Sequence, residues 1–254
     1  MPLPLLTLTG IDKIYKNGTV ALRGVDLAVQ PGEFVSLVGP SGCGKSTVLR
    51  LVAGLGALTG GTLAWQRPPA QRSLAFVFQD PALMPWASVV DNIYLPLKLK
   101  GHSLRSVRAD IQDAINTVDL GGFEGSYPRQ LSGGMKMRVS IARALVTKPH
   151  VLLMDEPFGA LDEMTRSRLN SDLLHLWENK AWTVLFVTHN IYEAVYLSSR
   201  VVVMAARPGR IVADIAIDAA YPRTDRFRTS LQFNHYCRDI MTALSVAEEE
   251  TAVR

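Results

Sequence analysis

A glycine-rich run between an apolar segment and a helical pattern constrains this chain more than any other feature. Residues 39–46 read GPSGCGKS, in which one glycine is followed by four residues and then by Gly-Lys-Ser. The run follows the apolar segment Phe34–Val38 and precedes helical spacing that begins at Thr47. Glycines allow a tight turn with backbone N–H groups pointing inward, and a helix N-terminus carries partial positive charge. The run therefore predicts a strand, a loop and a helix that together hold phosphate groups.

Two side chains of this loop have chemistry suited to a nucleoside triphosphate. We expect Lys45 to neutralise the β- and γ-phosphates and Ser46 to give its hydroxyl to a magnesium ion. A glycine-rich turn without a ligand and a catalytic thiol at Cys43 are the weaker interpretations. The residues predicted to surround the nucleotide phosphates are Gly39, Pro40, Ser41, Gly42, Cys43, Gly44, Lys45, Ser46 and Thr47.

The composition is that of a folded globular protein. The 254 residues are 48% hydrophobic and 20% charged, which argues against a disordered tail or a fibrous repeat. The net charge of +4 is spread without a basic run, so nucleic-acid binding is permitted but not indicated. Cys43 and Cys237 make no disulfide framework. No segment has the roughly 18 consecutive apolar residues of a membrane-spanning helix, and Met1–Leu8 lacks a charged leader, so we expect a cytoplasmic protein.

Short apolar runs alternate with helical patterns along most of the chain. The expected buried strands are Phe34–Val38, Leu74–Phe78, Val151–Met154, Thr183–Val187 and Val201–Met204. The expected helices are Ser46–Ala53, Leu104–Val118, Ser132–Thr147, Asp162–Asn179 and Ile191–Leu197. This alternation predicts an α/β fold, namely a P-loop NTPase core with a mainly parallel sheet.

Two regions of the expected core depart from this alternation. Strand-like pieces separated by turn residues predict a flanking antiparallel β patch, and they are Leu5–Thr9, Val25–Val29 and Thr62–Trp65. Residues 91–125 predict a polar helical insertion, which belongs to a helical subdomain of about 91–147.

The C-terminal part changes character after Ala205. A Pro208-Gly209 turn leads to the strand-like run Ile211–Ile217, and only weak helical spacing follows. We expect residues 1–217 to form one nucleotide-binding domain. Residues 218–254 are expected to form an appendage, a helical cap that ends in a frayed tail.

An acidic pair follows one of the buried runs. Asp155 and Glu156 come directly after Val151–Met154, at the carboxyl end of an expected strand, where α/β sheets hold their ligands. We expect Asp155 to face magnesium, and Glu156 to orient or deprotonate the water that attacks the γ-phosphate. Capping of the following helix is the alternative role for these acids, and the phosphate loop makes it the weaker one.

A second expected helix start is also suited to an anion. Ser132 is a natural N-cap, and Gly133 and Gly134 leave backbone N–H groups accessible. One nucleotide does not need two phosphate-binding helix ends. We therefore expect this helix end to serve a nucleotide that is held by another copy of the chain.

With this motif the chain resembles the ATP-binding cassette (ABC) family over residues 5–217, because LSGGM at residues 131–135 is similar to the family's signature motif. The resemblance implies that Gln79 contacts magnesium and the attacking water, and that His189 holds the γ-phosphate. Taken singly, these residues are also typical of surface or packing positions. Their order and spacing favour the nucleotide roles.

The resemblance also implies an aromatic contact and a dimer interface. Tyr15 is at the position of an aromatic side chain that stacks on adenine, and Asp162 belongs to a D-loop that lies across the interface. Met135 stands where many relatives carry glutamine, so it cannot offer the side-chain hydrogen bond to the partner nucleotide's ribose. Met135 and Met137 are expected to pack in the dimer interface instead.

The resemblance further implies partners and a cargo. ATP and Mg²⁺ would bind between two copies of the chain, and two membrane-spanning permease subunits would receive the motion, with Asp80–Trp86 as the candidate docking surface. A locally buried loop is the alternative for this segment. Local patterns are most similar to the nitrate, sulfonate and taurine importer group, which implies a bacterial importer at the cytoplasmic face of the inner membrane. A periplasmic or external solute-binding protein would deliver the anion.

Several other functions share parts of this sequence pattern. An ABC export cassette has the same ATP machinery and is the nearest alternative. A soluble ABC ATPase acting on DNA or ribosomes would carry a long coiled coil or two cassettes, and a P-loop kinase would need neither Ser132 nor His189. His235 and Cys237 are too few to form a metal site.

Overall fold

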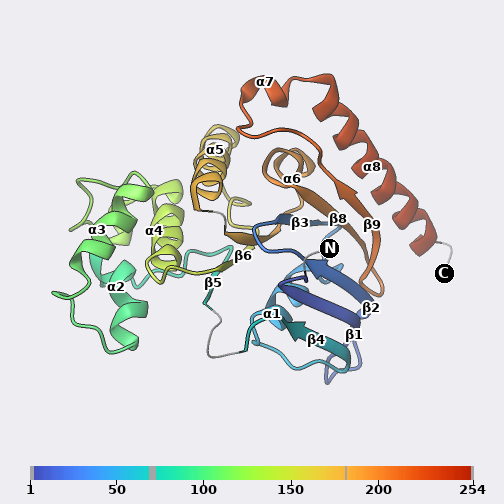
Figure 1. The fold of residues 1–254 in the computed structure, drawn as a ribbon, viewed down its shortest axis with the longest axis horizontal. Coiled ribbons are helices and arrows are strands. Elements are labelled where there is room, and N and C mark those ends of the chain that lie inside the picture. The colour runs from blue at the N-terminus through green and yellow to red at the C-terminus, as the bar shows by residue number, and fades with distance from the viewer. Residues whose placement is uncertain (1–2, 69–72, 181, 253–254) are drawn as a thin grey trace. The chain divides into compact units, whose positions relative to one another are not determined.

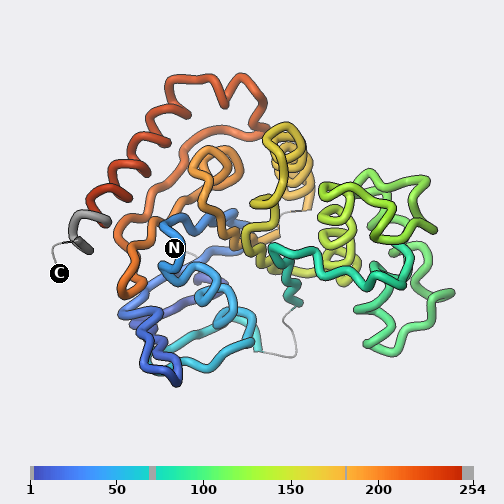
Figure 2. Tube along the Cα trace, turned by 180° about the vertical axis from the view of Figure 1, so that it is seen from behind, coloured from blue at the N-terminus to red at the C-terminus, as the bar shows by residue number. Residues whose placement is uncertain are grey.

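The computed structural model describes residues 3–68, 73–180 and 182–252. By their internal contacts these residues form two units. Unit 1 comprises Met1–Arg72 and Lys180–Arg254, and unit 2 comprises Ser73–Asn179. Figure 1 shows the elements with their labels, and Figure 2 shows the chain trace from behind.

Unit 1 contains two kinds of sheet. In the first, the strands pair antiparallel in the order β2-β1-β4. In the second, β7, β3 and β8 run parallel and β9 pairs antiparallel with β8. The strands are β1 (Leu6–Ile14), β2 (Val20–Val29), β3 (Phe34–Val38), β4 (Gly60–Trp65), β7 (Thr183–Val187), β8 (Arg200–Ala205) and β9 (Arg210–Ala216). All five residues of β3 and of β7 are buried, as expected for parallel strands covered on both faces.

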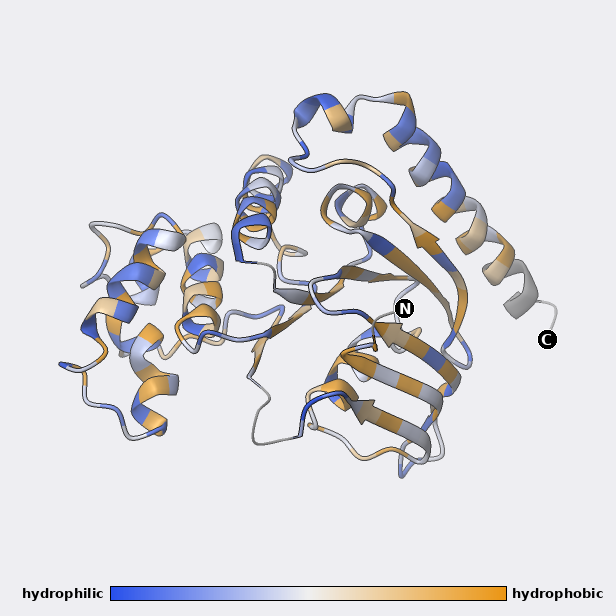
Figure 3. Cartoon of the chain, viewed as in Figure 1, coloured by the Kyte–Doolittle hydropathy of each residue, from blue (hydrophilic) through white to orange (hydrophobic). Residues whose placement is uncertain are grey.

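In the described part of unit 1, four helices accompany these sheets. They are α1 (Lys45–Val52), α6 (Ile191–Leu197), α7 (Asp225–Arg228) and α8 (Leu231–Ala252). Helix α8 is well formed where the sequence indicated only weak helical spacing. It presents a buried stripe at helical spacing to β8 and α6, namely Phe233, Cys237, Ile240 and Ala247. Figure 3 shows apolar and polar residues alternating along this helix.

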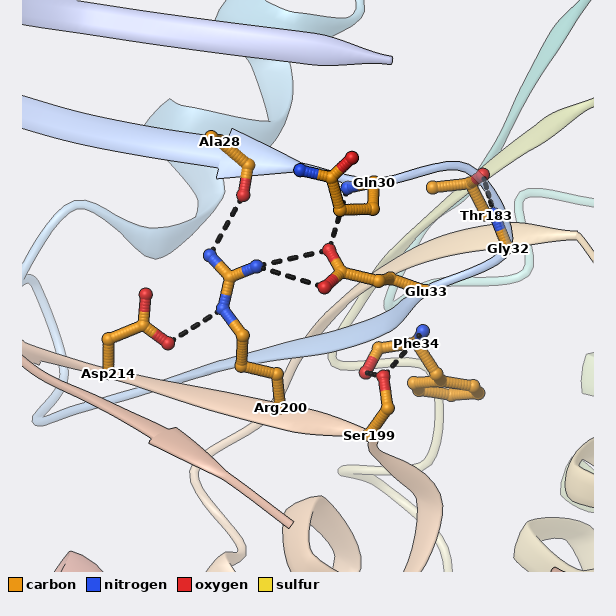
Figure 4. A network of polar contacts seen from close by, with 9 residues as sticks. All are labelled: Ala28, Gln30, Gly32, Glu33, Phe34, Thr183, Ser199, Arg200 and Asp214. Atoms are coloured by element: carbon orange, nitrogen blue, oxygen red, sulfur yellow. Dashed lines mark hydrogen bonds and ion pairs between the residues drawn. The ribbon is translucent and has the colours of Figure 1, made fainter. Parts of the chain in front are cut away.

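A partly buried arginine, Arg200, joins the two sheets of unit 1 through a network of polar contacts (Figure 4). Arg200, at the start of β8, donates to the carbonyl oxygen of Ala28 in β2 at 2.8 Å. It also forms ion pairs with Glu33 at 3.0 Å and with Asp214 of β9 at 2.7 Å. Because Arg200 has several planar donors, one side chain ties β2, the start of β3 and β9 together.

Unit 2 is mainly helical, with one parallel strand pair. The strands are β5 (Leu74–Val77) and β6 (Val151–Asp155), and the helices are α2 (Val89–Leu99), α3 (Arg108–Thr117), the 3₁₀ helix Pro128–Gln130, α4 (Gly133–Leu145) and α5 (Glu163–Lys180). Helix α3 begins four residues after the expected Leu104. The N–H of Ser106 bonds to the side chain and carbonyl of Ser103, so a local turn replaces the first helical turn there.

The predicted fold class is confirmed, with a mainly parallel sheet, an antiparallel three-stranded sheet and helical regions. Among the described residues, no helix combines the length and the apolar character needed to cross a bilayer.

Candidate active site

The glycine-rich loop of residues 39–46 connects β3 to α1 in unit 1. Gly44 is the N-cap of α1 and has a φ of 95°, in the left-handed region, and a Cβ there would lie 2.5 Å from Cδ2 of Leu22. Only glycine fits both the conformation and the space. Because a glycine has no capping side chain, the N–H groups at the start of α1 are left for an anion.

Lys45 folds back over this loop. Its Nζ donates to the carbonyl oxygens of Gly39 at 2.8 Å and Pro40 at 3.0 Å, and the residue is 5% exposed. A buried positive charge therefore lies within the curve of the loop, as phosphate binding requires. Cys43 is fully buried, and burial raises the pKa of its thiol. This favours the unreactive thiol form and gives no support to a catalytic cysteine.

Tyr15 lies beside the end of the phosphate loop, although it is 32 residues before Thr47 in sequence. Its hydroxyl is 3.3 Å from Oγ1 of Thr47 in α1. The Nζ of Lys13 lies 5.2 Å from the centre of the Tyr15 ring, and the tyrosine is 41% exposed. Unit 1 thus places an accessible aromatic ring next to the loop, which suits the predicted stacking on a base. Sequence analysis did not single out Lys13.

His189 emerges at the same sheet edge as the phosphate loop. Strands β3 and β7 are parallel neighbours with Leu37 opposite Val187, and the N–H of Thr188 donates to the Leu37 carbonyl at 3.2 Å. The loop and His189 therefore both follow the carboxyl ends of adjacent strands, where α/β folds bind ligands. His189 is exposed and Thr188 is buried.

Sequence analysis did not identify a glycine that packs closely against the phosphate loop. Gly209, in the turn before β9, accepts a hydrogen bond from Arg23 and donates one to Ala21 at 3.1 Å. A Cβ on Gly209 would lie 2.2 Å from the Cys43 carbonyl oxygen and 2.6 Å from that of Ala21. The Pro208-Gly209 pair looked like an ordinary turn because nothing local links it to a loop far away in the sequence.

Unit 2 brings the acidic pair and the glutamine together. Strands β5 and β6 are parallel with Val77 opposite Met154, so Gln79 and Glu156 follow the same edge. A Cβ on Gly159 would lie 3.6 Å from both the Gln79 Nε2 and the Glu156 Oε2, which shows that these two side chains reach the same place. Glu156 has a φ of 46°. Such a conformation is costly for a residue with a side chain and is concentrated at functional sites.

The predicted signature helix starts as expected. Ser132 is the N-cap of α4, and its Oγ accepts the N–H of Met135 at 3.2 Å. Ser132 and Gly133 are exposed. A Cβ on Gly134 would lie 2.7 Å from Cγ2 of Thr165, so the start of α4 lies against the start of α5.

The predicted D-loop before α5 is held by the side chains of Asp162 and of Arg166 in the first turn of α5. The Asp162 Oδ1 accepts the N–H of Thr165 at 3.0 Å, and this backbone hydrogen bond lowers the pKa of the Asp162 carboxyl. Arg166 donates to the carbonyl oxygens of Phe158 at 3.2 Å and Leu161 at 2.8 Å. Sequence analysis did not identify Arg166, because an arginine on a predicted helix is ordinarily a surface residue.

One expectation for the methionines is wrong. Met137 is 2% exposed and belongs to the buried face of α4, so it is not available to pack against another copy. Helical spacing explains this, since Gly134, Ile141 and Leu145, which lie on the same face of α4 as Met137, are buried too. Met135 is half-buried at the start of α4.

The segment Asp80–Trp86 is tied to α2 and α4 but is not a buried loop. Arg143 of α4 donates to the carbonyl oxygens of Pro81 at 2.6 Å and Ala82 at 2.9 Å. The Asn92 side chain accepts the N–H of Met84 at 2.8 Å. Trp86 remains 77% exposed. The large apolar side chain of Trp86 is thus exposed to solvent, while hydrogen bonds hold the backbone of the segment in place.

The oxygen donors predicted for magnesium suit that ion. Ser46, Gln79 and Asp155 offer a hydroxyl, an amide carbonyl and a carboxylate, and hard cations prefer oxygen ligands. Asp155 is 8% exposed. Within the described ranges, no group of three or more His, Cys, Asp or Glu residues is arranged to hold a metal ion, so His235 and Cys237 gain no support as ligands. Burial raises the pKa of Cys237 to about 11.

The candidate residues thus form two groups. Unit 1 holds the phosphate loop, Tyr15 and His189, and unit 2 holds the other predicted residues, namely Gln79, Ser132, Gly133, Gly134, Asp155, Glu156 and Asp162.

Comparison with known proteins identifies the family. The model of the family described as ABC transporter matches residues 22–159. An aliphatic sulfonates import ATP-binding protein, SsuB of Bacillus cereus, is 41% identical, with 93% of this chain and 94% of the relative covered. An uncharacterized ABC transporter ATP-binding protein of Methanocaldococcus jannaschii is 46% identical, with 93% and 89% covered. A solved ATP-binding cassette, a dimer in a post-hydrolysis state with ADP and Pi, is 32% identical with a TM-score of 0.74, covering 85% of this chain and 100% of that one. The chain therefore belongs to the ABC transporter family and is an ATPase of that family.

Proposed function

We propose that the chain is the ATP-hydrolysing subunit of an ABC importer and works as a homodimer. The observation that carries this is the exposed start of α4, where Ser132 and Gly133 face solvent at a helix N-terminus distinct from that of the phosphate loop. A second phosphate-binding helix end is useful when it serves the nucleotide of another copy. The dimeric state of the related cassette with ADP and Pi supports this arrangement.

Each group of residues has a defined task in this proposal. Lys45 and the loop amides bind the β- and γ-phosphates, and Tyr15 stacks on the base. His189 contacts the γ-phosphate, and Glu156 orients and deprotonates the attacking water. Mg²⁺, when bound, neutralises charge on the phosphates, with Ser46, Gln79 and Asp155 as its protein ligands. Loss of the γ-phosphate removes contacts that hold the dimer closed, so hydrolysis shifts the population to an open state.

The membrane subunits are proposed to dock on unit 2. The exposed Trp86 and a groove of about 280 Å³ support this, since its lining is largely apolar and includes Leu74, Phe76, Phe78, Leu95, Leu99 and Arg143. Phe76 and Phe78 stack there with ring centres 4.3 Å apart. Exposed apolar and aromatic surface of this kind fits a helix of a partner. The chain would then act at the cytoplasmic face of the membrane.

The cargo is proposed to be a small anion, either an aliphatic sulfonate, taurine or nitrate. The support is the likeness to sulfonate import ATP-binding proteins of several Bacillus species, at 41% to 45% identity. A solute-binding protein would deliver the anion to the membrane subunits.

The test is the variant Glu156→Gln in the complete complex, reconstituted in vesicles with its membrane subunits. We expect ATP binding to persist, ATP hydrolysis and anion uptake to fall by at least about 100-fold, and a dimer to be trapped by ATP. The matched control is Glu124→Gln, an acid in the segment between α3 and the 3₁₀ helix Pro128–Gln130, which should leave every readout unchanged.

The outcomes separate the parts of the proposal. Full ATP hydrolysis by Glu156→Gln would refute the role of Glu156. A monomer that encloses its nucleotide completely would refute the shared site. Uptake of none of the three anions by the unmodified complex would refute the proposed cargo, and movement of solute outward would refute the importer assignment.

A further inference from the structure

A buried arginine in the C-terminal part of unit 1 is engaged in an unusual number of hydrogen bonds. Arg223 lies between β9 and α7 and is 4% exposed. Its NH1 group donates to the carbonyl oxygens of Val195 at 2.9 Å, Tyr196 at 3.1 Å and Ser198 at 2.8 Å. Its NH2 group donates to those of Ile217 at 3.3 Å and Ala219 at 3.2 Å, which anchor it to its own strand end.

Three of these carbonyl groups belong to the C-terminal end of α6. The last carbonyls of a helix have no partner within the helix and carry partial negative charge. A guanidinium supplies several planar donors and a positive charge, which matches this need. Arg223 therefore caps the C-terminus of α6 from a segment that is distant in sequence.

The neighbouring residues of the same segment hold the side of α6. The Tyr196 hydroxyl donates to the Arg223 carbonyl at 2.9 Å, and the Arg228 guanidinium lies 3.5 Å from the centre of the Tyr196 ring. The rings of Tyr192 and Phe233 stack 6.1 Å apart. Figure 1 shows α7 and α8 beside α6, and these helices are in contact. The C-terminal segment thus holds α6 at its end and along its length.

The opposite end of α6 carries His189. The Thr188 hydroxyl donates to Glu193 in the first turn of α6, and the Asn190 N–H donates to the Thr188 Oγ1 at 3.0 Å. The Asn190 side chain accepts the N–H of Glu193 at 3.2 Å. Both neighbours of His189 are therefore bonded into the start of the helix. With seven residues, α6 is only ~10 Å long, so it moves as one piece.

We propose that Arg223 is a positioning residue for His189 and acts through α6. Because Arg223 fixes the C-terminal end of this short helix, it also determines the position of His189 next to the N-terminal end. The inference rests on the proposed contact of His189 with the γ-phosphate. It gives residues 219–233 a part in ATP hydrolysis, although none of them is among the proposed nucleotide-binding residues.

The test is a double-mutant cycle with Arg223→Lys and His189→Ala in the full chain. Lysine keeps the charge but not the planar set of donors. We expect Arg223→Lys to lower kcat for ATP hydrolysis by about fivefold with KM for ATP unchanged, as for the loss of one or two hydrogen bonds that position a contact. In the His189→Ala background, Arg223→Lys should lower kcat no further. Arg238→Lys, an exposed arginine of α8, is the matched control and should behave like the unmodified chain.

A second readout follows His189 directly. In protein labelled at histidine, the ring signals assigned to His189 by their loss in His189→Ala should broaden or shift in Arg223→Lys and not in Arg238→Lys. If Arg223→Lys fails to fold, Tyr196→Phe replaces it, because it removes only the hydroxyl bond to the Arg223 carbonyl. This milder variant should lower kcat by about twofold to threefold.

The outcomes are distinct. An equal loss of kcat in both backgrounds, or a change in thermal stability alone, would show that Arg223 only stabilises the fold and would overturn the inference. An unchanged kcat in His189→Ala would instead overturn the proposed role of His189, and the inference with it.

Discussion

The two helix starts assigned to phosphate binding, those of α1 and α4, are built differently. Helix α1 has a glycine N-cap without a capping side chain, and the buried Lys45 folds over its loop. At α4 the Ser132 side chain already accepts the N–H of Met135, and Met135, not a lysine, directly follows the glycines. At α1 the phosphate loop and its lysine form a complete binding site within the chain. The start of α4, in contrast, is an exposed helix end that is already capped and consists of small residues.

The surroundings of the two helix starts differ in the same sense. Leu22 and Gly209 pack against the phosphate loop, and the buried strand β3 precedes the loop in sequence. The start of α4 contacts Leu161 and Thr165 of the D-loop region. A loop backed by core is suited to bind a ligand alone, and a solvent-exposed helix end is suited to complete a site on another copy. Three substitutions test this distinction.

The largest effect is expected for Lys45→Ala. ATP affinity of the isolated chain should fall by about 100-fold, because charge-assisted bonds to two phosphates are lost. Isothermal titration with ATP and Mg²⁺ measures this. Lys98→Ala removes an exposed lysine of α2 and serves as the control. Unchanged affinity in Lys45→Ala would remove the distinction between the two helix starts.

A smaller and different effect is expected for Ser132→Ala. ATP affinity of the isolated chain should be unchanged, while ATP hydrolysis at dimer-forming concentrations should fall by about tenfold. Loss of the cap should also cost about 1 kcal/mol of stability. Ser88→Ala removes an equivalent cap, since Ser88 accepts the N–H of Asp91 at 3.1 Å, and it should lower stability without lowering hydrolysis. A weaker affinity for ATP in the isolated Ser132→Ala chain would contradict the assignment.

The smallest effect is expected for Met135→Gln. The new amide can offer one hydrogen bond to a ribose across the dimer, which corresponds to about a threefold fall in KM for ATP. The measurement is steady-state hydrolysis, with Met164→Gln as the control because Met164 is also on an early helix turn and is 86% exposed. An equal change in KM in Met135→Gln and Met164→Gln would mean that the effect does not come from a contact of residue 135 across the dimer.

Much of the site was readable from short stretches of sequence. The phosphate loop, the acidic pair and the serine cap of α4 each depend on a few neighbouring residues and their backbone geometry. The bounds of β3, β7 and α6 were also predicted correctly, because each is a compact apolar or periodic run between turn residues. The start of α3 was misplaced by four residues, since a serine turn competes with helix there.

The sequence by itself determined the local structures on which the proposed chemistry depends, since the glycine loop before Lys45 and the buried strand before Glu156 are each specified by a few neighbouring residues. Only the tertiary structure decided what supports those groups. Gly209 against the phosphate loop and Arg223 at the end of α6 each contact residues that are distant in sequence. Such contacts depend on how the chain folds back on itself. The pattern of neighbouring residues does not show which distant segments come into contact.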